Sequence, residues 1–188
     1  MKALPRMSSR SRQFLNFTVT CTSVILCILI LPTRMPGMEL LGISPNWLLI
    51  WVVAWSIKRK RTVLGAASMG LVLGFLQDAM TAPEPTHAVS LVVVAVLTVV
   101  LLKTWSIPAD LVERDPIPIA LIVFGMAVLA ETVMGLQFLA MGDRTLVDIW
   151  SDRQRVALCS AILSSLWAPV IYFPLNHLWE MTRTLEKS

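Results

Sequence analysis

A carboxylate within a long apolar stretch is the residue of this sequence with the clearest potential for chemistry. Glu131 lies inside the apolar run 117–141. An ionised carboxylate among apolar side chains is costly unless it is protonated, paired or faces a polar cavity. In long apolar helices, ionisable residues of this kind often mark functional sites. We therefore predict Glu131 to be a buried polar residue of a functional site.

Three further ionisable residues lie at the ends of apolar runs. Asp78 ends one run, His87 opens the next, and Arg144 follows the run that contains Glu131. If these ends meet at one end of the molecule, the four residues could form a polar site there, although no spacing rule brings them together. Asp78 could instead cap the following turn or be solvated, and a lone His87 is more typical of a capping or interface residue than of a ligand.

No known catalytic arrangement accompanies these residues. The sequence contains no GxSxG, HExxH, Walker or paired-carboxylate motif. Its three cysteines, Cys21, Cys27 and Cys159, lie in apolar runs without a CxxC or Cys/His cluster, so neither a metal site nor a disulfide is predicted. We therefore predict a protein that is not an enzyme and that holds no metal or cofactor.

The composition predicts that membrane helices position these residues. Of the 188 residues, 56% are hydrophobic and 15% are charged, whereas a typical soluble domain has about 25% charged residues. About 20 helical residues cross the bilayer core, so six crossings take roughly 120 residues. The remainder contains no polar stretch large enough for a separate soluble domain. The apolar runs are continuous rather than alternating, which disfavours a transmembrane β-barrel.

Six apolar runs predict one polytopic domain over residues 1–188, an all-α integral membrane bundle of six transmembrane helices. The predicted helices cover residues 14–31, 40–57, 62–77, 87–102, 117–141 and 156–175. The first run is too long for a signal peptide and lacks a cleavage pattern, so we expect it to be retained. The second is interrupted by Pro45, which would suit the first position of a regular helix. Whether the second, third and fourth helices fully span the bilayer stays open.

The basic residues predict the orientation of the bundle. Twelve of the 16 Lys and Arg residues fall in the N-terminus, in 58–61, in 103–116 and in the tail after 175. The other four are Arg34, Arg144, Arg153 and Arg155, the last three of them in 142–155, the longest outer connection. Since cytoplasmic loops carry an excess of basic residues, we predict that both termini are cytoplasmic. The basic clusters would also attract anionic lipid, and nothing requires a nucleic-acid partner.

The third predicted helix carries a face of small residues. Ala66, Gly70 and Gly74 recur every fourth residue, and Asp78 continues the same face. Small residues at this spacing allow two membrane helices to approach closely. The face therefore predicts helix packing, either within this bundle or against a helix of another protein.

Taken together, these features resemble the family of the bacterial rod shape-determining protein MreD. The resemblance rests on Pro45-Asn46 before the second helix, on the basic residues that follow it, and on the sequence Gly70-xxx-Gly74-Phe75-Leu76-Gln77-Asp78. It spans the chain in topology and residues 45–91 in motif.

The resemblance implies a function in the bacterial inner membrane. It implies a non-enzymatic scaffold of the cell-wall elongation machinery that helps to maintain cell shape. The implied partners are the single-span protein MreC, the elongation glycosyltransferase and transpeptidase and, indirectly, MreB filaments. The family is also similar in fold to the substrate-binding subunits of energy-coupling-factor transporters, so an alternative is a subunit that binds a small solute such as a vitamin. A weaker alternative is a channel or proton-linked carrier centred on Glu131.

Overall fold

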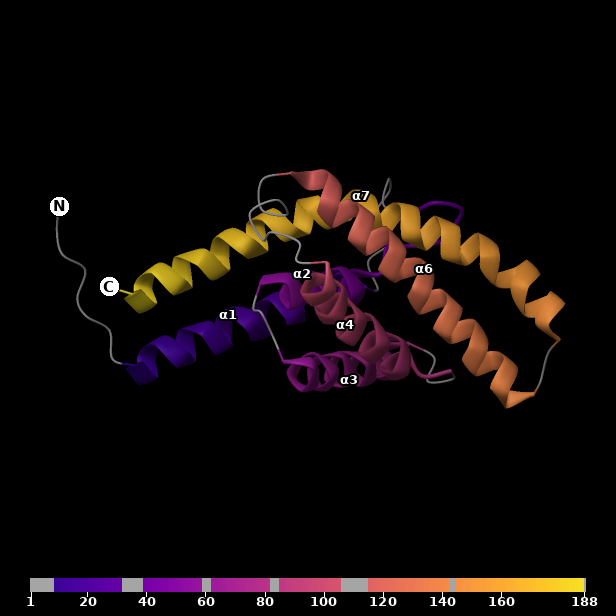
Figure 1. Cartoon of the computed structure of the whole chain (residues 1–188), viewed down its shortest axis with the longest axis horizontal. Coiled ribbons are helices and arrows are strands. Elements are labelled where there is room, and N and C mark those ends of the chain that lie inside the picture. The colour runs from indigo at the N-terminus through magenta and orange to yellow at the C-terminus, as the bar shows by residue number, and fades with distance from the viewer. Residues whose placement is uncertain are drawn as a thin grey trace.

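The computed structural model describes residues 9–31, 39–58, 62–81, 85–105, 115–142 and 145–187. Over these residues the chain is all-α, as predicted, with six helices arranged as in Figure 1. The helices are α1 (Ser9–Ile30), α2 (Trp47–Lys58), α3 (Val63–Met80), α4 (His87–Thr104), α6 (Pro116–Met141) and α7 (Leu146–Lys187).

Four helices are long and apolar enough to cross a membrane. They comprise α3, α4, α6 and the stretch Val147–Met181 of α7. The apolar parts of α1 and α2, Phe14–Ile30 and Trp47–Ile57, are shorter. Many large apolar side chains of the long helices are exposed, among them Leu71, Phe75, Leu121, Leu136, Leu166 and Val170. An exposed apolar surface of this extent is costly in water and favourable in lipid, so these helices indicate a membrane protein.

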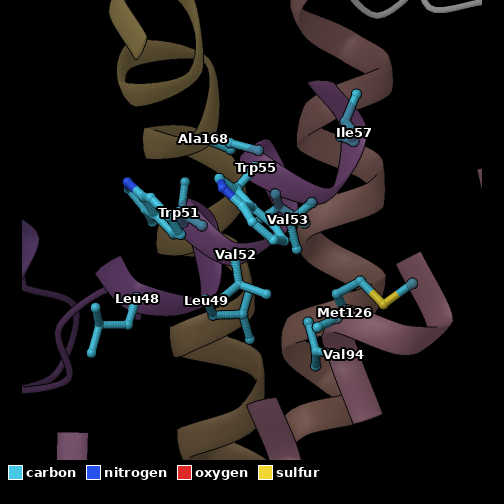
Figure 2. Close-up of a cluster of buried hydrophobic side chains, with 14 of the residues drawn as sticks. Leu48, Leu49, Trp51, Val52, Val53, Trp55, Ile57, Val94, Met126 and Ala168 are labelled. Atoms are coloured by element: carbon cyan, nitrogen blue, oxygen red, sulfur yellow. The ribbon is translucent and has the colours of Figure 1, made fainter. Parts of the chain in front are cut away.

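The shortest helix, α2, forms the centre of the fold. Every side chain from Leu48 to Ala54 is fully buried, and α2 packs against each of the other five described helices. Figure 2 shows its side chains among Val94 of α4, Met126 of α6 and Ala168 of α7. A helix that is hydrophobic on all sides must be enclosed by other helices or by lipid. Here the surrounding helices enclose it.

Serine hydroxyls of α1 and α7 accept hydrogen bonds that hold α2 in place. The indole Nε1 of Trp51 donates to Ser23 Oγ of α1 at 2.9 Å, and the backbone N–H of Asn46 donates to Ser164 Oγ of α7 at 2.9 Å. The Asn46 side chain in turn accepts from the Leu49 N–H at 3.0 Å. Asn46 is therefore the N-cap of α2.

The second predicted helix, 40–57, begins seven residues too early. Leu40 and Ile43 exchange two backbone hydrogen bonds of 3.0 Å, and the intervening Leu41 and Gly42 both have positive φ, 55° and 79°. Such a tight turn cannot continue into a helix. Pro45 precedes the N-cap and does not occupy the first helical position. The 12 residues of α2 span about 18 Å, less than the bilayer core of about 30 Å.

The prediction of a long outer connection over 142–155 is wrong. Gly142 ends α6 in a left-handed conformation, φ 80°, and α7 begins at Leu146. α7 then continues for 42 residues through Pro169 and Pro174 and includes most of the predicted tail 176–188. At 1.5 Å per residue it is about 63 Å long. In Figure 1 its first half lies beside α6 and its last half beside α1.

Candidate functional site

A cavity of about 500 Å³ lies where the α3–α4 connection meets the hairpin of α6 and α7. We call it the polar cavity. Its lining residues are Thr81, Pro85, His87, Glu131, Met134, Phe138, Ile149, Asp152, Arg153 and Val156. Ligand-binding cavities commonly measure 300–1,000 Å³ and combine apolar walls with a few polar groups. This cavity has both properties.

Glu131 is paired with Arg153 at the wall of the polar cavity. The Nη1 of Arg153 donates to Glu131 Oε2 at 3.1 Å, and the two side chains are 27% and 17% exposed, respectively. The guanidinium also lies over the ring of Phe138, with 4.3 Å from Cζ to the ring centroid. The ion pair offsets the cost of a carboxylate within an apolar helix. The structure thus places Glu131 both beside a cation and at a cavity.

Asp78 joins the end of α3 to the beginning of α4. Its Oδ2 accepts from Thr86 Oγ1 at 2.5 Å, and its Oδ1 accepts from the His87 backbone N–H at 2.7 Å. The Nδ1 of His87 lies 2.7 Å from the same Oδ1. Thr86 is the N-cap of α4 and accepts from the Ala88 N–H at 3.1 Å. Asp78 therefore satisfies donors of the first turn of α4 and also fixes the imidazole of His87.

Three of the four residues considered for a polar site lie at the polar cavity or contact a residue that lines it. Asp78 contacts His87, and His87 and Glu131 both line the polar cavity. The fourth, Arg144, lies outside the described residues. The cation beside Glu131 is instead Arg153, a residue that the sequence predicts to lie in the outer connection. The apolar residues Ile149 and Val156, one heptad apart on either side of Arg153, are the signal that this segment is helical and faces α6.

The small-residue face of α3 packs against α4 of the same chain. A Cβ added to Gly74 would lie 2.1 Å from the Cα of Ala88, and one added to Gly70 would lie 2.6 Å from the carbonyl oxygen of Leu91. Ala66 is fully buried. Because the backbones of the two helices touch at Gly70 and Gly74, these two residues are enclosed within the molecule.

An apolar groove of about 630 Å³ lies between α1 and α3, with Trp55 of α2 among its lining residues. α1 contributes Asn16, Phe17, Thr20, Cys21, Val24 and Ile25, and α3 contributes Met69, Val72, Leu73 and Leu76. Phe17, Ile25 and Val72 are more than half exposed. We call this feature the α1–α3 groove.

Neither a metal-binding cluster nor a match to a known protein adds to this description. In the described parts of the chain, no three His, Cys, Asp or Glu side chains are grouped so that they could hold a metal ion. Comparisons of the chain with protein-family models, with curated proteins and with solved structures give no match.

Proposed function

We propose that the chain is a non-enzymatic membrane scaffold of the bacterial cell-wall elongation machinery, with MreC and the elongation synthases as partners. The resemblance of residues 45–91 to the MreD family is the sequence support. The structural observation that carries a scaffold role is the α1–α3 groove, an apolar surface between two helices. A bundle with short connections meets a membrane partner mainly through such helix faces.

The α1–α3 groove is our proposed docking site for the single span of an MreC-like partner. The face of Gly70 and Gly74 cannot be the docking site, because it packs against α4. We therefore propose the groove in its place. Membrane helices associate through close packing and interhelical hydrogen bonds rather than through a hydrophobic driving force. The apolar side chains of the groove offer packing, and Asn16 and Thr20 add polar atoms.

Filling the groove tests this proposal. Val72→Trp should abolish co-purification of the MreC-like protein encoded in the same genome, because the indole would occupy the space needed by the partner helix. The matched control is Val170→Trp on α7, since Val72 and Val170 are 54% and 56% exposed and only Val72 lines the groove. Equal recovery of the partner with both variants, at equal membrane levels, would count against docking in the groove.

We further propose that the chain crosses the membrane six times, with both termini in the cytoplasm. We also propose that its fold is similar to that of energy-coupling-factor substrate-binding subunits. The N-terminal end of α1 and the C-terminal end of α7 lie at the same end of the molecule (Figure 1), which supports an even number of crossings. The predominance of basic residues in alternate connections supports the cytoplasmic side for both ends.

The polar cavity favours a second candidate function, the binding of a small solute for a transporter. Its support is a cavity of about 500 Å³ that carries Glu131, Arg153 and His87. The two functions predict different partners: an MreC-like protein for the scaffold and an ATPase pair for the transporter subunit. Affinity purification from native membranes, followed by mass spectrometry of the retained proteins, distinguishes them.

A further inference from the structure

The polar cavity presents charges of both signs beside an apolar wall. Arg153 supplies a guanidinium, and Glu131 and Asp152 supply two carboxylates. The apolar wall comprises Met134, Phe138, Ile149 and Val156. The residues of α6 and α7 thus give the cavity a cationic group, anionic groups and a surface for an apolar side chain.

Arg153 has donor capacity beyond its contact with Glu131. A guanidinium carries five N–H donors in one plane, and the Glu131 contact uses a donor on Nη1. Phe138 covers a face of the guanidinium, so further hydrogen bonds would form at its edge, in the plane of the N–H groups. A ligand carboxylate can approach this edge in the bidentate geometry that arginine favours.

The charges of the cavity select the class of ligand. A simple anion that reached Arg153 would also meet the carboxylates of Glu131 and Asp152, and a simple cation would meet the guanidinium. A zwitterion satisfies both signs at once. We infer that the polar cavity binds a small zwitterionic solute with an apolar body, such as an apolar amino acid or a short apolar peptide. Its carboxylate lies on Arg153 and its ammonium group on the acidic side.

This inference goes beyond the scaffold proposal and does not depend on it. A scaffold can hold a small ligand, and the inference supplies a substrate class for the second candidate function. Binding is measured on the purified chain without partners, whereas the scaffold test measures partner recovery. The failure of one is therefore distinguishable from the failure of the other.

Three ligands of similar shape test whether the cavity prefers a zwitterion, an anion or a cation. They are L-phenylalanine, 3-phenylpropanoate without the ammonium group and 2-phenylethylamine without the carboxylate. Apolar dipeptides, with their amidated and acetylated forms, extend the set to larger zwitterions. Calorimetric titration of the full chain in nanodiscs should show the zwitterion of a set binding at least tenfold more tightly than its two single-charge analogues.

Variants of the cavity residues then show which protein side chain binds which charged group of the ligand. Arg153→Gln should remove the preference for the zwitterion over the amine, because the carboxylate loses its partner. Asp152→Asn should reduce the preference for the zwitterion over 3-phenylpropanoate. Arg155→Gln is the matched control, since Arg155 is an exposed arginine of the same helix that does not line the cavity. Its affinities should equal those of the unmodified chain.

Where all the variants fold, two results would overturn the inference. One is that no zwitterion of either size binds more tightly than its single-charge analogues. The other is that Arg155→Gln changes the preference as much as Arg153→Gln does. If Arg153→Gln does not fold, Asp152→Asn is the deciding variant, because Asp152 is exposed and its substitution should not prevent folding. The quantity compared is the ratio of the affinities for the zwitterion and for 3-phenylpropanoate. An unchanged ratio in that variant also overturns the inference.

Discussion

At the residue scale, Gly74 marks the closest approach between two helices. The Cβ of an alanine there would lie 2.1 Å from the Cα and 2.6 Å from the backbone N of Ala88. Both atoms belong to the backbone of α4, so a rotamer change cannot relieve the clash. Overpacking a well-packed interior costs about 1–3 kcal/mol and occasionally more. We predict that Gly74→Ala lowers the free energy of unfolding by at least about 2 kcal/mol.

The matched control for Gly74 is a glycine with open space around it. A Cβ added to Gly125 of α6 would have no atom within 4 Å. Gly125→Ala should leave the stability unchanged or raise it, by up to about 1 kcal/mol from helix propensity. Thermal unfolding of both variants in one detergent checks the comparison. If the two melting temperatures fall equally, the contact between α3 and α4 is not as close as the structure has it.

At the element scale, Asp78 determines where α4 begins. The carboxylate accepts from Thr86 and from the His87 N–H, and its side chain is 11% exposed. Asp78→Ala leaves these donors without their acceptor in a site with little access to water. We predict that amide exchange at His87 and Ala88 rises at least tenfold, which corresponds to a local loss of about 1.4 kcal/mol. Hydrogen–deuterium exchange of the purified protein measures it.

A second helix cap provides the comparison for Asp78. Thr62 caps α3 by accepting from the Gly65 N–H at 3.2 Å, but Thr62 is exposed. Since water can replace its hydroxyl, Thr62→Ala should change exchange at Gly65 by a smaller factor than Asp78→Ala changes it at His87. A larger effect at Gly65 would contradict the role assigned to Asp78.

Three of the four long apolar helices were predictable from the sequence, whereas the bounds of α7 and the enclosed position of α2 were not. The predicted ranges 62–77, 87–102 and 117–141 lie within three residues of α3, α4 and α6 at each end, because prolines and charges bound these apolar runs. α2 is equally apolar but is enclosed by other helices. Hydrophobicity alone does not distinguish burial in protein from burial in lipid, so its length and its central position were not apparent.

The site was predictable only where a residue was chemically out of place. Glu131 is conspicuous because it is a carboxylate in an apolar run. Arg153 is not, because it lies in a polar segment, and its position opposite Glu131 depends on the hairpin between α6 and α7. A pair 22 residues apart on two helices has no local sequence pattern. Only the register of the two helices brings it together.

At the scale of the whole molecule, the path of α2 decides how many times the chain crosses the membrane. Its 12 residues cover about 18 Å, which is less than the bilayer core. If residues 32–38 and 59–61 lie on opposite sides of the membrane, the segment 39–46 before α2 has to complete the crossing. If α2 does not complete the crossing, these two connections lie on the same side. One accessibility measurement therefore tests the six-crossing proposal.

Single cysteines in an otherwise cysteine-free chain report the side of each connection. With six crossings, Gly37→Cys and Asp143→Cys should react with a membrane-impermeant maleimide in spheroplasts. Lys60→Cys and Glu186→Cys should react only after lysis, because their basic neighbours favour the cytoplasmic side. The decisive position is 60. If Lys60→Cys reacts in spheroplasts together with Gly37→Cys, α2 is a buried half-crossing. The two termini then lie on opposite sides, and the even count that Figure 1 supports is wrong.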